Sequence, residues 1–325
     1  MRLGFSVRVL GQRGLRAYDT RRPHSAPHLS VSLAHLRDVF AYLAKINVQF
    51  YRMSAELAPY NTHPAHPQLH RQIEECTAEL AAIGALARHY ALRLTFHAPL
   101  HVQLAAEDPI IAQQSFQTLE VLAALLDGMV LDADAVIVVH VGGIYGAVDA
   151  TVGRWAARWD ELSDVIRRRL VLEHDDSGPS LGLALRIHAA TGVPIVFDQL
   201  HFCLNNPEGW SLAEGLAVAL ATWPYDRTPK VHFSSPRTEL RVVERVDPVS
   251  GRQRWALSPP RPGHHADFLN PWEFSTLLQA AKGARDFDIM LEAKAADLAL
   301  LRLRQDLRTY LPDLARSIGL QEVHP

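Results

Sequence analysis

The sequence predicts an α/β fold, a single (β/α)8 TIM barrel, and three observations support it. Short runs rich in β-branched residues alternate with longer amphipathic stretches, and this unit recurs eight times. Several short runs are almost continuously apolar, as strands covered on both faces are. Eight such units in succession are typical of a parallel barrel with an outer ring of helices. A doubly wound sheet is the competing fold, but no GxGxxG follows the first run.

The individual elements follow from periodicity and from helix-end signals. The expected strands span 2–9, 48–53, 92–97, 135–141, 169–174, 193–198, 229–233 and 287–292. The expected helices lie near 31–46, 69–91, 109–128, 150–167, 179–191, 211–222, 271–284 and 294–309. Pro109 and Pro271 stand just inside two helix starts, and Gly192 stands just past a helix end.

The chain is expected to form one domain over 1–325, with two exceptional segments. The stretch 234–270, after the seventh strand, is rich in proline and arginine and is longer than an ordinary connection. Loops of this length are usually functional or mobile. The arginines of this stretch are interleaved with Glu239, Glu244 and Asp247, so the run is interpreted either as a salt-bridged hairpin or as a segment that contacts phosphates. Residues 310–325 are expected to form a C-terminal tail.

Composition excludes several classes of protein. The chain has 325 residues, 48% of them hydrophobic, with 33 basic and 35 acidic side chains and a net charge of −2. No run approaches the roughly 18 apolar residues that span a bilayer, and the start lacks a signal-peptide pattern. Cys76 and Cys203 lie far apart and not in a metal-knuckle spacing. We therefore expect a cytoplasmic globular protein without a membrane partner.

Histidine is abundant, with 17 residues, and its placement is informative. Metal-ligand side chains recur at or near the ends of the expected strands and in the loops that follow. They are His63, His97, His140, Glu173, Asp198, His201, His232, His265 and Glu292. Because these ends meet at one mouth of a barrel, bare carboxylates there would be costly to hold together. Divalent cations such as Mn²⁺, Zn²⁺, Fe²⁺ or Co²⁺ remove that cost, and so many ligands predict two or three ions.

Lys230 is the unusual member of this group. It alternates with His232 along one strand, so both side chains point to the same face. Three interpretations remain open: a lysine that reaches a rim carboxylate, a cation that stabilises a phosphate in the transition state, or a carbamylated lysine that acts as an anionic bridge.

At this point the chain resembles the ultraviolet-damage endonucleases, members of the xylose-isomerase-like barrel superfamily that also contains endonuclease IV. The matching segments run in family order: 2–5 (RLGF), 50–54 (FYRMS), 59–64 (PYNTHP), 95–97 (TFH), 139–146 (VHVGGIYG), 172–176 (LEHDD), 196–201 (VFDQLH), 229–234 (PKVHFS), 265–267 (HAD) and 291–294 (LEAK).

The resemblance implies specific roles. The nine side chains above become metal ligands, with His265 preferred over His264, and Lys230 matches a lysine beside the metals that can be carboxylated. Lys230, Glu173 and His232 are the expected catalytic residues. Two or three divalent ions are implied, Mn²⁺ first. Family members incise damaged double-stranded DNA on the 5′ side of a lesion.

The segment expected to probe DNA departs from the family pattern. Where the family has glutamine followed by an aromatic residue, this chain has Leu100 and His101, and Phe5 stands where tyrosine is common. With Tyr145, these are the expected DNA-contacting side chains. A leucine wedge can still unstack bases, and a histidine can still stack.

The predicted function is therefore a metal-dependent DNA repair endonuclease that hydrolyses a phosphodiester 5′ to a damaged or distorted site, acting as a monomer. Abasic-site incision is a sub-case. The alternatives are a metal-dependent isomerase or epimerase of small sugars and a metalloenzyme acting on another substrate, with a non-catalytic binding protein ranked last. A groove as wide as a duplex favours the nuclease, whereas a small closed pocket favours the isomerase.

Overall fold

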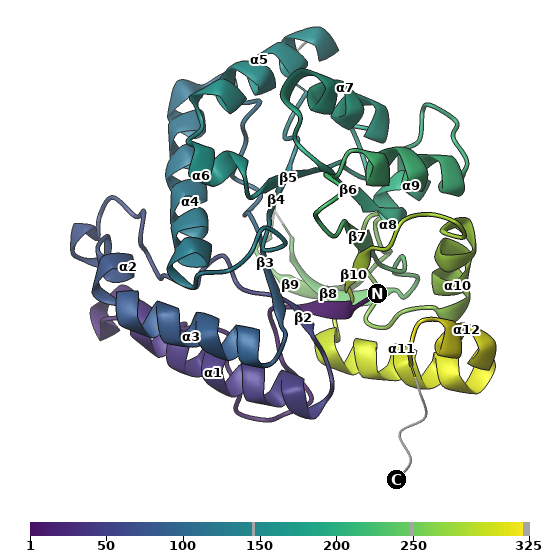
Figure 1. Ribbon diagram of the computed structural model, residues 1–325, viewed down its shortest axis with the longest axis horizontal. Coiled ribbons are helices and arrows are strands. Elements are labelled where there is room, and N and C mark those ends of the chain that lie inside the picture. Colours follow the sequence, from purple (N-terminus) through teal and green to yellow (C-terminus); the bar gives the residue numbers. More distant parts are fainter. Residues whose placement is uncertain (145–146, 248–249, 321–325) are drawn as a thin grey trace.

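Eight parallel strands close into a barrel in the computed structural model, which describes residues 1–144, 147–247 and 250–320 (Figure 1). The strands are β1 (Leu3–Ser6), β2 (Phe50–Arg52), β3 (Arg93–His97), β4 (Ile137–His140), β5 (Leu170–Glu173), β6 (Ile195–Asp198), β7 (Lys230–Phe233) and β10 (Asp288–Leu291). They close in the order β1-β10-β7-β6-β5-β4-β3-β2. Each predicted strand range contains the observed strand, so the barrel prediction is confirmed.

Helices surround the barrel, as Figure 1 shows. They are α1 (Leu29–Lys45), α2 (Gln72–Glu75), α3 (Thr77–His89), α4 (Pro109–Gly128), α5 (Val148–Glu161), α6 (Asp164–Arg167), α7 (Leu181–Thr191), α8 (Gln199–Leu204), α9 (Leu212–Ala221), α10 (Pro271–Ala280), α11 (Ala296–Tyr310) and α12 (Pro312–Ser317). Asp108 and Asn270 cap α4 and α10 through their side chains, each followed by the expected proline. Within the described residues, we find no helix with the length and apolar character needed to cross a membrane.

The barrel interior is built from every second residue of each strand. Val138, Val171 and Val196 lie in a small buried cluster, and each stands two positions before a polar residue at its strand's C-terminal end. Strand side chains alternate between faces, so His140, Glu173 and Asp198 point to the same interior, one layer higher. A hydrophobic floor on this side therefore supports a polar layer at the C-terminal mouth of the barrel.

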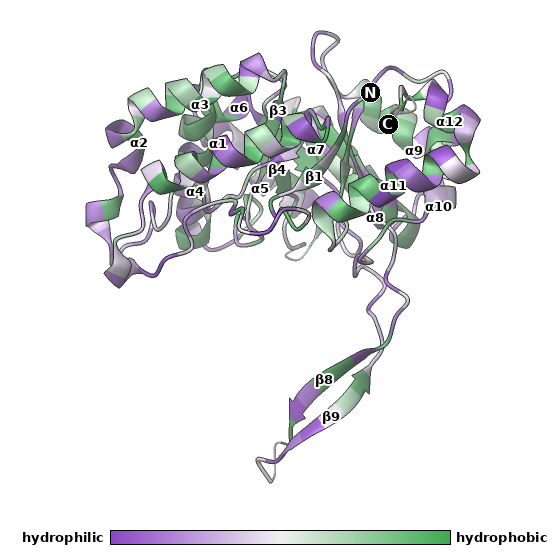
Figure 2. Cartoon of the chain, turned by 90° about the horizontal axis from the view of Figure 1, so that it is seen from below, coloured by the Kyte–Doolittle hydropathy of each residue, from purple (hydrophilic) through white to green (hydrophobic). Residues whose placement is uncertain are grey.

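The segment 234–270, expected to be a loop, contains two further strands. β8 (Arg241–Val246) and β9 (Gln253–Ser258) pair as an antiparallel hairpin that stands away from the barrel (Figure 2). Part of 310–325, expected to form a C-terminal tail, is helical, because it contains α12. Pro312 begins that helix, and Ala315 is buried in the hydrophobic core. Residues 321–325 lie outside the described part of the chain.

Candidate metal centre

Glu173 is the hub of the polar layer. Its side chain is 1% exposed, with Oε1 2.7 Å from Nδ1 of His232 and Oε2 2.9 Å from Nε2 of His97. Nδ1 of His97 donates to the Ala98 carbonyl oxygen at 2.9 Å, which turns Nε2 toward the carboxylate. Burial alone would raise the pKa of Glu173, but His232 and His140 hold it well below its usual value. This carboxyl group is therefore a buried anion surrounded by imidazoles.

Asp198 contributes a second carboxylate, and its two oxygens have different surroundings. Oδ1 accepts a hydrogen bond from the backbone N–H of His201 at 2.9 Å and so caps α8. Oδ2 is buried and has no hydrogen-bond partner among the described residues, and the same holds for Nε2 of His232. Burial raises the pKa of Asp198 to about 6. Buried polar atoms without partners are rare in proteins, and a bound ion is one reason for them.

His140 and His201 complete this side of the layer. Nε2 of His140 lies 3.8 Å from Glu173 Oε2, and its Nδ1 forms an ion pair with Asp175 at 2.5 Å. Nδ1 of His201 lies 2.9 Å from the His174 carbonyl oxygen and 3.6 Å from Glu173 Oε1. Burial disfavours both imidazolium forms, but the neighbouring carboxylates raise the pKa of each histidine to about 9. The electrostatic potential in this layer therefore favours positively charged groups.

Glu292 follows β10 and faces the layer from the opposite side. Its Oε1 lies 3.6 Å from Nδ1 of His232 and forms an ion pair with Arg52 of β2. Its Oε2 lies 3.8 Å from Nδ1 of His265, whereas the neighbouring His264 is exposed. Arg52 counters the burial penalty and keeps the pKa of Glu292 below its usual value. The structure thus brings eight expected ligands together, here called the central cluster: His97, His140, Glu173, Asp198, His201, His232, His265 and Glu292.

Lys230 lies in the layer beneath the central cluster. It is fully buried, and its Nζ lies 3.3 Å from Oγ1 of Thr95 and 5.9 Å from the centroid of the Phe50 ring. Burial, with Arg52 nearby, holds the pKa of this amine well below its usual value. The lysine forms no ion pair with a described residue, which excludes a lysine paired with a rim carboxylate.

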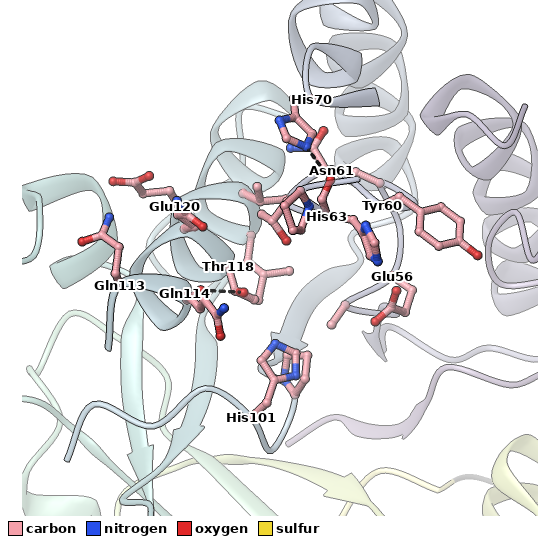
Figure 3. Close-up of a pocket in the computed structure, with 18 of the residues that line it drawn as sticks. Glu56, Tyr60, Asn61, His63, His70, His101, Gln113, Gln114, Thr118 and Glu120 are labelled. Atoms are coloured by element: carbon pink, nitrogen blue, oxygen red, sulfur yellow. Dashed lines mark hydrogen bonds between the residues drawn. The ribbon is translucent and has the colours of Figure 1, made fainter. Parts of the chain in front are cut away.

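His63 is not brought into the central cluster, which corrects its expected place. It lies in the exposed loop after β2, where its ring packs against Tyr60 and His66 and its Nδ1 accepts from the Ala65 backbone N–H. His63 and His101 line an open cavity of about 1050 Å³ between this loop and α4 (Figure 3). Local ring contacts within the loop thus hold the histidine to one side.

The structure places the expected DNA-contacting residues in different environments. Leu100 is 76% exposed and shares a second cavity, of about 500 Å³, with His140 and Gln103. Phe5 is fully buried and packs edge-on against Tyr51 inside the molecule. The expectation that Phe5 contacts DNA is therefore wrong, because an apolar ring in the first strand joins the core. Tyr145 lies outside the described residues.

Sequence reasoning missed three residues that support the central cluster. Asp175 contacts His140, and Arg52 pairs with Glu292. His174 is fully buried, with Nε2 accepting from the Asp198 backbone N–H at 3.2 Å, and burial lowers its pKa to about 3. Asp175 and His174 follow Glu173 directly, and Arg52 ends the second strand, so proximity to the strand ends was a usable signal for all three.

The donor set of the central cluster fits divalent metal ions. Two groups, His97–His140–Glu173 and Glu173–Asp198–His232, each offer three ligand atoms within 4.8 Å of one another and share Glu173. Imidazole and carboxylate together are the ligands of Zn²⁺, Mn²⁺ and Fe²⁺ sites. The fold and this cluster define a (β/α)8 barrel with a set of potential metal ligands at the C-terminal ends of its strands.

Comparison with known proteins identifies the family. The model of the family described as UV-endonuclease UvdE matches residues 23–319. A UV DNA damage endonuclease of Bacillus velezensis is 31% identical over 283 residues, covering 86% of this chain and 82% of the relative. One from Bacillus cereus is 28% identical over 277 residues, 85% of this chain and 80% of the relative. The chain belongs to the UV-endonuclease UvdE family.

Solved structures agree in fold. The crystal structure of SacUVDE superposes with a TM-score of 0.77 at 24% identity, covering 95% of this chain and 98% of that one. Endonuclease IV from Thermus thermophilus gives 0.56 at 15% identity, covering 96% and 100%. A D-tagatose 3-epimerase-like protein also gives 0.56 at 15%, covering 98% and 100%. At such identities the likeness shows the barrel alone, so it lends the isomerase alternative no chemical support.

Proposed function

We propose that the protein is a metal-dependent endonuclease that hydrolyses a phosphodiester bond on the 5′ side of a damaged or distorted site in double-stranded DNA. Two buried ligand atoms, Asp198 Oδ2 and His232 Nε2, carry the proposal, because neither has a hydrogen-bond partner among the described residues. Both belong to residues of the ligand group that contains Glu173. In a member of this family, such a centre is suited to two or three divalent ions, with Mn²⁺ proposed first and Zn²⁺, Fe²⁺ or Co²⁺ as alternatives.

Each residue has a defined part in this proposal. Divalent ions, when bound, supply charge that polarises the scissile phosphate and a water molecule. Glu173 links the two ligand groups and balances their charge, while His232 offers Nε2 from the innermost position. Ala98 and the backbone of His174 fix the ring orientations of His97 and His201, as carbonyl partners of metal-binding histidines do.

Lys230 is proposed to act from below the cluster. Its burial without an ion-pair partner among the described residues, and the lowered pKa of its amine, disfavour a permanent positive charge and support the carboxylated form that the resemblance implies. A carboxylated lysine would carry a negative charge toward the ligands, whereas the free amine would not. Mass spectrometry or ¹³C NMR of protein supplied with labelled bicarbonate distinguishes these two states.

The proposed substrate is damaged duplex DNA, opened at the mouth of the barrel. Leu100, exposed beside a cavity that His140 also lines, is placed to wedge between bases, and His101 stands next to it. With these residues in place of an amide and an aromatic ring, abasic or strongly distorted sites are the proposed preferred lesions, since opening costs least there.

The protein is further proposed to act as a monomer in the cytoplasm. Cys76 and Cys203 are both free thiols, which fits a reducing compartment. Light scattering on the purified chain tests the monomer.

The deciding experiment is incision of end-labelled duplexes that carry a photoproduct, an abasic site or no lesion, each with and without Mn²⁺. The proposal requires a metal-dependent cut on the 5′ side of at least one lesion and none in the undamaged duplex. Equal cutting of all three duplexes, or cutting in the presence of a chelator, would overturn it.

A further inference from the structure

The β8–β9 hairpin extends from the same face of the barrel as the central cluster. It follows β7, whose strand carries His232, and the chain returns through His265 to the cluster. Figure 2 shows the hairpin projecting as a separate ribbon beyond the barrel. Each strand has six residues, so the ribbon is about 20 Å long at about 3.3 Å per residue.

The register of the ribbon divides its side chains into two unlike faces. Directly opposed residues of an antiparallel pair point to the same side, and successive residues alternate. One face carries Arg241, Val243, Arg245, Arg254, Ala256 and Ser258. The other carries Val242, Glu244, Val246, Gln253, Trp255 and Leu257. The first face is basic, and the second is mainly apolar.

The apolar face explains how a lone hairpin keeps its shape. Val242 lies opposite Leu257, and Trp255 is diagonal to Val242. Such cross-strand pairs stabilise two-stranded ribbons and fix their register, which an isolated hairpin needs in water.

The basic face carries a destabilising arrangement. Arg245 and Arg254 lie directly opposite each other, and like charges in that position weaken a strand pair. Arg241 lies on the same face. All three are exposed, and none forms an ion pair with a residue that the structure describes. An anionic partner would relieve the repulsion and provide the missing counter-charge.

We infer that the β8–β9 ribbon is a DNA-binding arm. In this arrangement the face that carries Arg241, Arg245 and Arg254 lies in the major groove of the duplex that flanks the incision site. This inference rests on the proposed function. A major groove is wide enough for a two-stranded ribbon, and arginines on such a ribbon reach phosphates on both sides. At about 3.4 Å per base pair the arm covers roughly six base pairs of flanking duplex.

The test compares two triple variants with the same change in net charge. The arm variant is Arg241→Gln with Arg245→Gln and Arg254→Gln. The matched control is Arg37→Gln with Arg302→Gln and Arg316→Gln, three exposed arginines on the outer helices α1, α11 and α12. Affinity is measured on undamaged duplex of about 30 base pairs over a series of salt concentrations. Binding is used because it needs no cleavage.

The arm variant is expected to bind at least tenfold more weakly than the native protein, and its slope of log affinity against log salt should fall by about 2 to 3. The control should change affinity by less than about twofold, as remote surface charges do. Trimming one flank to a few base pairs should weaken the native protein more than trimming the other, and this asymmetry should disappear in the arm variant.

Three results would overturn the inference: equal slopes for the native protein and the arm variant, a control that weakens binding as much, or equal effects of trimming either flank. If Trp255→Ser with Leu257→Ser abolishes self-association while the arm variant binds DNA normally, the ribbon is an interface between copies instead. If the native protein incises lesions but the arm variant keeps full affinity for DNA, the DNA-binding role of the ribbon is refuted and the proposed function stands. If DNA binding depends on the arm but no metal supports incision, the DNA-binding role of the ribbon stands and the proposed function is refuted.

Discussion

Nδ1 of His232 lies 2.7 Å from Oε1 of Glu173, and neither side chain is more than 1% exposed. This contact joins β7 to β5 across the interior of the barrel, and it leaves the opposite imidazole nitrogen without a partner among the described residues. Glu173 belongs to both ligand groups, so we expect metal binding to depend on its negative charge more than on that of any other residue.

Glu173→Gln is therefore expected to lose at least one equivalent of metal and to lower incision by at least about 100-fold, because an amide cannot balance the charge of the ions. Elemental analysis after reconstitution with Mn²⁺ measures the first effect. Glu161→Gln, the same change at the exposed end of α5, is the control and should behave like the native chain. Full metal content in Glu173→Gln would contradict the assignment.

Asp175→Asn should weaken metal binding without abolishing it. Asp175 contacts His140, and loss of such a partner commonly lowers metal affinity by about 10- to 100-fold. We expect incision to recover as Mn²⁺ is raised, which would not occur for a lost ligand. A variant that stays inactive at saturating Mn²⁺ would mean that Asp175 has a more direct role.

Chelation should lower the melting temperature by about 5 °C or more, since ions that bind only the folded chain stabilise it by mass action. The central cluster draws residues from β3, β4, β5, β6, β7 and the segment after β10, so metal loss releases much of the barrel mouth. Thermal melts with and without chelator measure the shift, and Glu173→Gln should show a smaller one. An identical shift in both proteins would place the stabilising ion elsewhere.

The loop before α1 should contribute acid-sensitive stability through Asp19. Burial would raise the pKa of this carboxyl, but hydrogen bonds from Arg21 and from the His28 backbone lower it to about 2, against 3.8 ordinarily. A lowered folded pKa gives stability that is present above pH 4 and is lost as the pH falls toward 2.

Asp19→Asn should reduce the free energy of unfolding by about 2 kcal/mol at pH 7, since charge-assisted hydrogen bonds are lost. The difference from the native protein should shrink between pH 4 and pH 2. Urea denaturation at several pH values measures it, with Asp38→Asn on α1 as an exposed control. A deficit that is constant with pH would show that the charge of Asp19 is not the cause.

The probe loop should set lesion choice. Leu100→Gln with His101→Tyr is expected to raise incision at cyclobutane dimers relative to abasic sites by about fivefold, the equivalent of one regained hydrogen bond of about 1 kcal/mol. The ratio of the two incision rates is the measurement, and it cancels differences in metal loading. A native protein that already strongly prefers dimers, or an unchanged ratio, would contradict this account.

The sequence predicts the barrel well because its signals are local. Buried strands such as 137–140 are continuous apolar runs that end in one polar residue, and that pattern marks both the strand and its open end. His97, His140, Glu173 and Asp198 each end a strand, and they meet for this reason. His63 follows a strand end too, but its ring meets Tyr60 edge-on and packs against His66 at a tilt, and no spacing rule describes such contacts.

The hairpin and the buried Phe5 show how far local patterns reach. The alternating charges of 237–254 predict a hairpin, and β8 and β9 form one, but Arg241, Arg245 and Arg254 make no ion pair with a described residue, so the expected salt bridges are missing. Phe5 was assigned because it stands where tyrosine is common in the family, yet its ring packs into the core against Tyr51. Arg52 was overlooked because its partner, Glu292, is 240 residues away.

The first turn of α8 begins at the central cluster. Asp198 supplies one oxygen to start that helix and the other to the cluster, and His201 stands on the turn so formed. Helix geometry thus sets the separation of two ligands, and neither can shift without the other. A substitution at Asp198 changes the secondary structure and the ion site together, so mutational loss there cannot be divided between them. During divergence of the family, these two positions should be replaced jointly or remain unchanged.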